Sequence, residues 1–148
     1  MDYNNYIKIS ASKILITDYD GDLTELPENL FEGIQSVDHL YIYAKNISKF
    51  PATLNQITVN QSISLTNNKI KLLPEFVLRS KNLKSLEIDA YRVDIEQGIT
   101  DLIGLENLKL HTFKGKKMPL GLQQLKGLKS LYLQEKVGKK IHHLELVK

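Results

Sequence analysis

Residues 60–74 read NQSISLTNNKIKLLP, and this stretch decides the fold. Ile63 and Leu65 alternate with polar residues, which is typical of a strand that buries one of its two faces. Leu73 is followed at once by Pro74, whose missing N–H suits a point where the chain leaves a sheet. The stretch predicts a short strand followed by a turn out of the sheet.

The same pattern recurs along the chain every 22 to 24 residues. Each of the four prolines follows a large apolar residue, and their successive separations are 24, 23 and 45 residues. The pattern L-x-x-L-x-L occurs in the same phase, beginning at Val37, Asn60, Leu83, Leu105 and Leu128. One such repeat cannot bury its own apolar face, so neighbouring repeats must stack on one another. We therefore expect a parallel sheet of short strands with a continuous core behind it.

This pattern resembles that of the leucine-rich-repeat proteins, L-x-x-L-x-L-x-x-N-x-L-x-x-L-P, over residues 23–140. The resemblance implies an α/β fold, a curved leucine-rich-repeat solenoid. Its parallel β-sheet would line the concave face, and short helical or irregular segments would form the convex face. One departure concerns the consensus asparagine, which pairs backbone groups in the turns. Asn68 fills that position once, and other residues fill it elsewhere, so we expect the asparagine ladder to be mostly absent: Lys45, Tyr91, Phe113 and Lys136.

We expect a single domain over residues 1–148, with an N-terminal cap at 1–22, about five repeats at 23–137 and a C-terminal cap at 138–148. Caps are needed because an open end of the stack exposes apolar surface and unpaired strand edges. Residues 6–9 and 14–16 predict two short strands in the N-terminal cap. Residues 141–146 fit a closing strand or a truncated repeat, and we favour the closing strand.

The composition indicates an ordered globular protein, because 42% of the residues are hydrophobic and 25% are charged. The sequence has no apolar run near the roughly 18 residues that a membrane helix needs, and its beginning does not look like a signal peptide. It has no cysteine, which excludes disulfides, thiolate zinc sites and a cysteine nucleophile. We therefore expect a cytoplasmic protein with no membrane partner.

The charge is distributed unevenly along the chain. Residues 105–148 carry 10 lysines against 3 glutamates, whereas residues 1–55 carry 4 lysines against 8 acidic residues. Two Gly-Lys-Lys runs one repeat apart predict a basic edge of six lysines: Lys114, Lys116, Lys117, Lys136, Lys139 and Lys140. Such an edge would attract an acidic ligand, or it would only protect an end strand from pairing with another chain.

Residues 15–24, LITDYDGDLT, are the most suggestive acidic motif. They resemble the D-x-D-G-T motif of haloacid-dehalogenase phosphatases, but Asp22 replaces the threonine and the chain has no two adjacent acidic residues to help hold magnesium. A calcium loop of the EF-hand type starting at Asp18 would have Leu23 and Asn29 where glycine and glutamate are required. We interpret the motif as a polar turn, with weak calcium binding as the alternative.

No catalytic group, metal site or cofactor is predicted, and we do not expect an enzyme. His39 and His111 lie three repeats apart, which is roughly 15 Å at ordinary strand spacing. His142 and His143 are adjacent and would point to opposite sides of a strand. We find no spacing of a nucleophile and a base, and no glycine-rich phosphate loop.

The outward positions of the strands are the best candidate for a binding site. Exposed tyrosines on a rigid sheet suit protein recognition, because they bury a large area at a low entropic cost. From N- to C-terminus the face runs from aromatic through acidic to basic, over these residues: Tyr41, Tyr43, Ser64, Thr66, Glu87, Asp89, Lys109, His111, Tyr132 and Gln134.

The predicted function is non-catalytic recognition of another protein through this concave face. The chain would then act as a monomer, as a small inhibitor of the immunity type or as an adaptor. Nucleic acid is not the expected partner. The alternative function is binding of nucleic acid or another acidic ligand through the C-terminal lysine edge.

Overall fold

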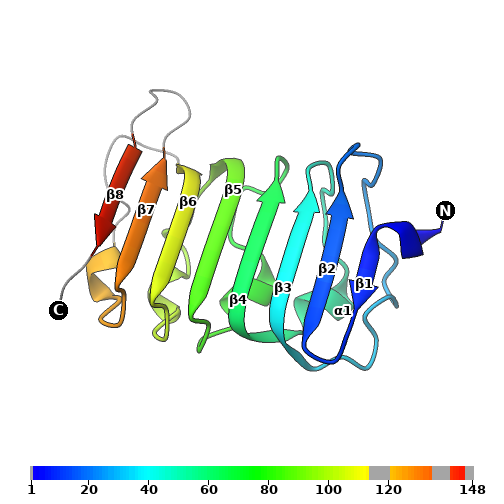
Figure 1. The fold of residues 1–148 in the computed structure, drawn as a ribbon, viewed down its shortest axis with the longest axis horizontal. Coiled ribbons are helices and arrows are strands. Elements are labelled where there is room, and N and C mark those ends of the chain that lie inside the picture. Colours follow the sequence, from blue (N-terminus) through cyan, green and yellow to red (C-terminus); the bar gives the residue numbers. More distant parts are fainter. Residues whose placement is uncertain (1, 114–120, 135–140, 146–148) are drawn as a thin grey trace.

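The computed structural model describes residues 2–113, 121–134 and 141–145. These residues form an α/β fold built on one open, mixed sheet, in which each strand lies beside the strand that follows it in the chain (Figure 1). The strands are β1 (Ile7–Ile9), β2 (Lys13–Asp18), β3 (Ser36–Ala44), β4 (Thr58–Asn67), β5 (Ser85–Val93), β6 (Asn107–Phe113), β7 (Ser130–Gln134) and β8 (Ile141–Glu145).

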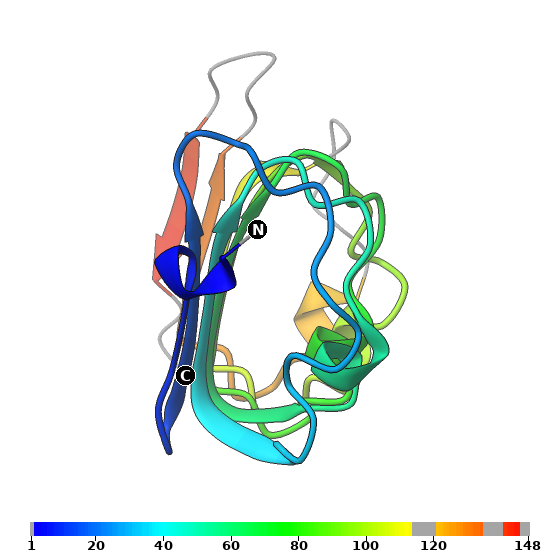
Figure 2. The same ribbon diagram turned by 90° about the vertical axis from the view of Figure 1, so that its right-hand side faces the viewer.

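Short helical turns lie behind the sheet, on the segments that lead from one parallel strand to the next (Figure 2). Pro51 and Pro74 are the N-caps of two of them, where a missing N–H costs no hydrogen bond. These turns are α1 (Ala52–Asn55), α2 (Glu75–Leu78), η2 (Ile99–Asp101) and η3 (Leu122–Gln124). A further turn, η1 (Tyr3–Asn5), precedes β1 and does not belong to these segments.

The strands from β2 to β7 run parallel, and their register stacks equivalent apolar residues of the repeats. Two rows of side chains point into the core, and none of their members is more than 3% exposed. One row is Ile14, Leu40, Ile63, Leu86, Leu108 and Leu131, and the other is Ile16, Ile42, Leu65, Ile88, Leu110 and Leu133. The inward positions predicted for the L-x-L part of the motif are confirmed in every repeat, whereas Asn60, at the first position of its repeat, is exposed.

Antiparallel strands flank the parallel part of the sheet at both ends. β8 runs antiparallel to β7, which is the direction of a closing strand, because a further repeat would place a parallel strand there. β1 pairs antiparallel with β2. β2 differs from the expectation of a cap strand: it pairs in parallel with β3 over residues 13–18, and both Ile14 and Ile16 are fully buried. β2 is therefore the first strand of the parallel stack.

The predicted role of Asn68 in an asparagine ladder is wrong, and Asn67 has that role instead. Asn68 is exposed. Asn67 is fully buried, because β4 extends to it and the alternation that buries Leu65 also turns residue 67 inward. In the sheet register the ladder position holds Asp18, Ala44, Asn67 and Ala90, so polar residues alternate with alanine.

The Asn67 side chain joins the turns of two successive repeats. Its Nδ2 donates to the carbonyl oxygens of Ala44 at 2.9 Å and Ile47 at 2.8 Å, both in the preceding repeat. Its Oδ1 accepts from the backbone N–H groups of Lys69 at 2.7 Å and Ile70 at 2.9 Å. All four hydrogen bonds are buried or partly buried, so this one amide satisfies backbone groups that water does not reach freely.

Candidate binding surface

One face of the sheet carries no covering layer among the described residues. Seen along the stack, α1, α2, η2, η3 and the described parts of the segments between successive parallel strands lie on the other side of the sheet (Figure 2). We call the uncovered side the open face. Its side chains are those that alternate with the buried rows.

All ten residues predicted for the binding face lie on the open face, in two rows across β3 to β7. One row consists of Tyr41, Ser64, Glu87, Lys109 and Tyr132, and the other of Tyr43, Thr66, Asp89, His111 and Gln134. None of the ten is buried, and Lys109 is the most open of them. The parallel register thus turns residues spread over 94 positions of the chain (41 to 134) into one continuous surface.

The N-terminal end of the open face is an aromatic cluster flanked by two cations. Lys13 Nζ lies 5.2 Å from the centre of the Tyr41 ring, and Lys45 Nζ lies 5.6 Å from the centre of the Tyr43 ring, within the range of cation–π attraction. The ring of Tyr19, which is 74% exposed, lies 5.2 Å from that of Tyr43. The sequence did not indicate Lys13, Tyr19 or Lys45, because their positions depend on β2 and its turn.

Hydrogen bonds hold part of this cluster in place. Ser62 Oγ lies 2.7 Å from His39 Nδ1 and 3.1 Å from the Tyr41 hydroxyl oxygen. The rings of His39 and Tyr41 also stack, with centres 5.9 Å apart. A tyrosine held in this way loses little further freedom when a partner packs on it.

Charged and polar groups make up the C-terminal end of the open face. Glu87 Oε2 lies 3.9 Å from Lys109 Nζ and 4.0 Å from His111 Nε2. His111 Nδ1 lies 3.2 Å from Gln134 Oε1, and its ring centre is 5.3 Å from that of Tyr132. The long, solvated ion pair between Glu87 and Lys109 contributes little to stability. Both side chains can therefore leave this pair and bind charged groups of a partner at a low cost in free energy.

The acidic motif forms a turn around the buried carboxylate of Asp18, which is 1% exposed. Its Oδ1 accepts from the N–H groups of Gly21 at 3.0 Å and Asp22 at 3.1 Å, and its Oδ2 accepts from that of Leu23 at 2.9 Å. Asp18 occupies the ladder position of Asn67, and among the described residues the strand that precedes β2 is the antiparallel β1. All three printed hydrogen bonds of the Asp18 carboxylate are accepted from N–H groups of its own turn. These contacts favour the interpretation as a polar turn.

Tyr6 lies near this acidic turn. Partial burial raises the pKa of the Tyr6 hydroxyl, and the carboxylates of Asp22, Asp18 and Asp20 raise the pKa further. Within the described ranges, no three His, Cys, Asp or Glu side chains gather in a way that could hold a metal ion.

Replacing Asp18 with asparagine is expected to lower the free energy of unfolding by about 1–2 kcal/mol. The amide NH₂ must then face a backbone N–H that now donates to a carboxylate oxygen. Urea denaturation measures the change, and Asp20→Asn serves as the control, because Asp20 is exposed in the same turn. Equal stability of the two variants would contradict the capping role of Asp18.

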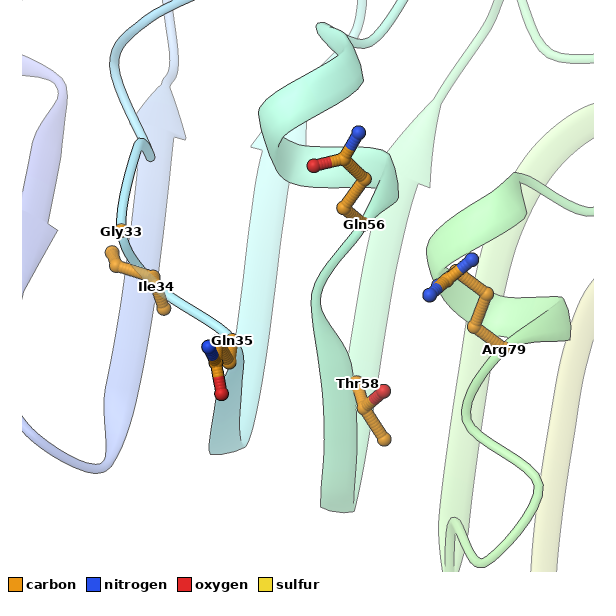
Figure 3. A pocket seen from close by; sticks show the side chains of 6 residues that line it. All are labelled: Gly33, Ile34, Gln35, Gln56, Thr58 and Arg79. Atoms are coloured by element: carbon orange, nitrogen blue, oxygen red, sulfur yellow. The ribbon is translucent and has the colours of Figure 1, made fainter.

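Hollows lined by described residues lie on the side of the sheet that bears α1 and α2. One has a volume of about 550 Å³ and lies between the starts of β3 and β4 and the ends of α1 and α2 (Figure 3). Its lining consists of amides, a threonine, a guanidinium, an isoleucine and a glycine: Gly33, Ile34, Gln35, Gln56, Thr58 and Arg79. The second has a volume of about 360 Å³ and adjoins the turns that follow β3 and β4.

The six lysines of the predicted basic edge all lie outside the described residues. Likewise, none of the helices in the described ranges is both long and apolar enough to cross a membrane. In the comparisons with known proteins, no protein-family model matches the chain, and neither a curated protein nor a solved structure is significantly similar to it. The resemblance to leucine-rich-repeat proteins stays a prediction that rests on the repeated motif.

Proposed function

We propose that the chain is a leucine-rich-repeat solenoid that recognises another protein through the open face of its sheet, which would be the concave face. The solenoid is supported by the parallel register from β2 to β7, by the stacked apolar rows and by the connections from β2 through β6, which pass behind the sheet (Figure 2). Such a stack would be a rigid platform, because each strand is fixed by both neighbours.

The two uncovered rows that run from Tyr41 and Tyr43 to Tyr132 and Gln134 are the observation that carries the binding function. At strand spacing they extend over roughly 19 Å, a width that suits the roughly 800 Å² that one partner contributes to an ordinary protein interface. Tyrosines at one end supply apolar contact area, and Glu87 with Lys109 supplies charges that choose a partner and its orientation.

This surface acts by occupation rather than by chemistry. Ser62 Oγ does lie 2.7 Å from His39 Nδ1, within the range of a hydroxyl and its base, but the same hydroxyl also lies 3.1 Å from the Tyr41 hydroxyl. We interpret these contacts as a network that holds the tyrosine in place. A cytoplasmic, monomeric inhibitor that covers the working surface of a target, or an adaptor, would need no more than this.

Affinity capture from the cells that express the protein tests the proposal, with quantification of bound proteins by mass spectrometry. The test variant is Tyr43→Ala/Glu87→Ala/Lys109→Ala, which removes one aromatic, one acid and one base from the open face. The control is Glu32→Ala/Gln56→Ala/Arg79→Ala, which makes the same change in net charge at exposed positions away from that face. Circular dichroism verifies that both variants are folded.

The partner is expected to bind the control as it binds the wild type, and to bind the test variant at least about tenfold more weakly, as loss of central interface residues implies. Equal capture by all three proteins would contradict the proposal, and so would the absence of any protein retained by the wild type.

A further inference from the structure

The hollow of about 360 Å³ lies between the turns of two successive repeats, near the edge of the sheet where β3 and β4 end. The segment after β3 contributes Lys49, and the segment after β4 contributes Lys69, Lys71 and Leu72. Asn55, at the end of α1, lines it from the helix side. The hollow is therefore away from the open face.

Positive charge dominates the lining of this hollow. Lys49, Lys69 and Lys71 are all exposed, and Glu75 is the one acidic residue among the lining residues. None of the ion pairs formed within the described part of the chain involves these three lysines. The lining thus carries an excess of two positive charges, and an acidic ligand would displace the solvent ions that gather beside these lysines.

The same hollow also presents apolar surface. Leu72 is 49% exposed, although the core does not require an apolar residue at that position. The preceding repeat shows this: Lys49 precedes Phe50 and Pro51 just as Leu72 precedes Leu73 and Pro74. An exposed leucine among lysines is a combination that binds an acidic chain with an apolar side chain better than it binds a bare polyanion.

We propose that this hollow docks a short acidic peptide segment of a partner protein. The carboxylates of the segment lie beside Lys49, Lys69 and Lys71, and one large apolar side chain packs on Leu72. This site is independent of the open face, so the two surfaces can bind one partner at two places or two different partners.

Selection from a displayed library of random twelve-residue peptides tests the proposal. The full-length wild type is the bait, and the variant Lys49→Gln/Lys69→Gln/Lys71→Gln is used to remove peptides that bind elsewhere. We expect the enriched peptides to combine at least two acidic residues with a large apolar residue. Enrichment of basic peptides, of peptides without an apolar residue, or of none would overturn the proposal.

Fluorescence anisotropy with the most enriched peptide, synthesised with a label, measures the contribution of each group. The triple lysine variant is expected to weaken binding about tenfold or more, and Leu72→Ser about fivefold. The matched control is Lys81→Gln/Lys84→Gln/Lys126→Gln, which removes the same charge from exposed residues in the turns that precede β5 and β7. It should bind within about twofold of the wild type.

Three results in this assay would overturn the docking site. Equal losses in the two triple lysine variants would reveal an effect of net charge alone. Displacement of the peptide by single-stranded DNA, together with an unchanged affinity of Leu72→Ser, would identify a surface for polyanions. Loss of binding in Tyr43→Ala/Glu87→Ala/Lys109→Ala would show that the peptide binds to the open face instead. If that variant still binds the peptide, the docking site does not depend on the open face. A failure of one proposal can then be distinguished from a failure of the other.

Discussion

Replacing Leu86 with alanine is expected to lower the free energy of unfolding by about 2–5 kcal/mol. Leu86 has no exposed surface and lies in the middle of a core row, between Ile63 and Leu108. Neighbouring repeats hold it on both sides, so the structure can collapse only partly into the space that the substitution leaves. Urea denaturation monitored by circular dichroism measures the loss.

Glu87→Ala is the matched control for this prediction. Glu87 is the next residue of β5 and lies on the open face, where its ion pair with Lys109 is long and solvated. Its removal should change the free energy of unfolding by less than about 0.5 kcal/mol. Because a shift of one residue exchanges the two faces of a strand, equal costs for Leu86→Ala and Glu87→Ala would show that the register is wrong.

Asn67→Ala is expected to lower the free energy of unfolding by about 3 kcal/mol or more. The substitution removes the donor to the carbonyl oxygens of Ala44 and Ile47 and the acceptor for the N–H groups of Lys69 and Ile70. Four backbone groups then have no hydrogen-bond partner at sites that water does not reach freely. This costs more free energy than the loss of the same bonds on the surface, where water would replace them. Chemical denaturation again provides the measurement.

Two further variants test whether the position and the amide are both required. Asn68→Ala should change stability by less than about 0.5 kcal/mol, because the side chain of Asn68 is exposed. Asn67→Asp should be nearly as harmful as Asn67→Ala, because a carboxylate would face the carbonyl oxygens of Ala44 and Ile47. If Asn68→Ala proved the more costly, the ladder would have to be moved to residue 68.

The arrangement of the parallel strands could be predicted from the sequence because it depends on period. Ile63, Leu86 and Leu108 recur at equivalent points of the motif, and alternation assigns the side chain of each to the core. β2 was harder to place, because Asp18 and the turn after it lengthen the spacing to Leu23. The consensus motif places the ladder asparagine at residue 68, because it counts a fixed number of positions after Leu65. Burial depends instead on where β4 ends, and β4 extends to Asn67, whose side chain turns inward.

The residues of the candidate surface, too, could be predicted from the sequence only in part. The rows that contain Tyr41 and Glu87 could be predicted, because the register of β3 to β7 follows from the repeat. The cations near the tyrosines, Lys13 and Lys45, could not, because they come from the first strand of the stack and from a turn. The hollow beside Leu72 depends on how the turns of two repeats pack, which no periodicity describes.

Site-specific photo-cross-linking in the cells that express the protein tests the central claim most directly. The photoreactive residue p-benzoylphenylalanine replaces either Tyr43 or Tyr132, at the two ends of the open face, or the exposed residues Gln56 or Gln97 away from it. We predict adducts with the same protein from positions 43 and 132, and none with that protein from positions 56 and 97. Adducts from positions 56 or 97 only, or from none of the four positions, would contradict recognition through the open face.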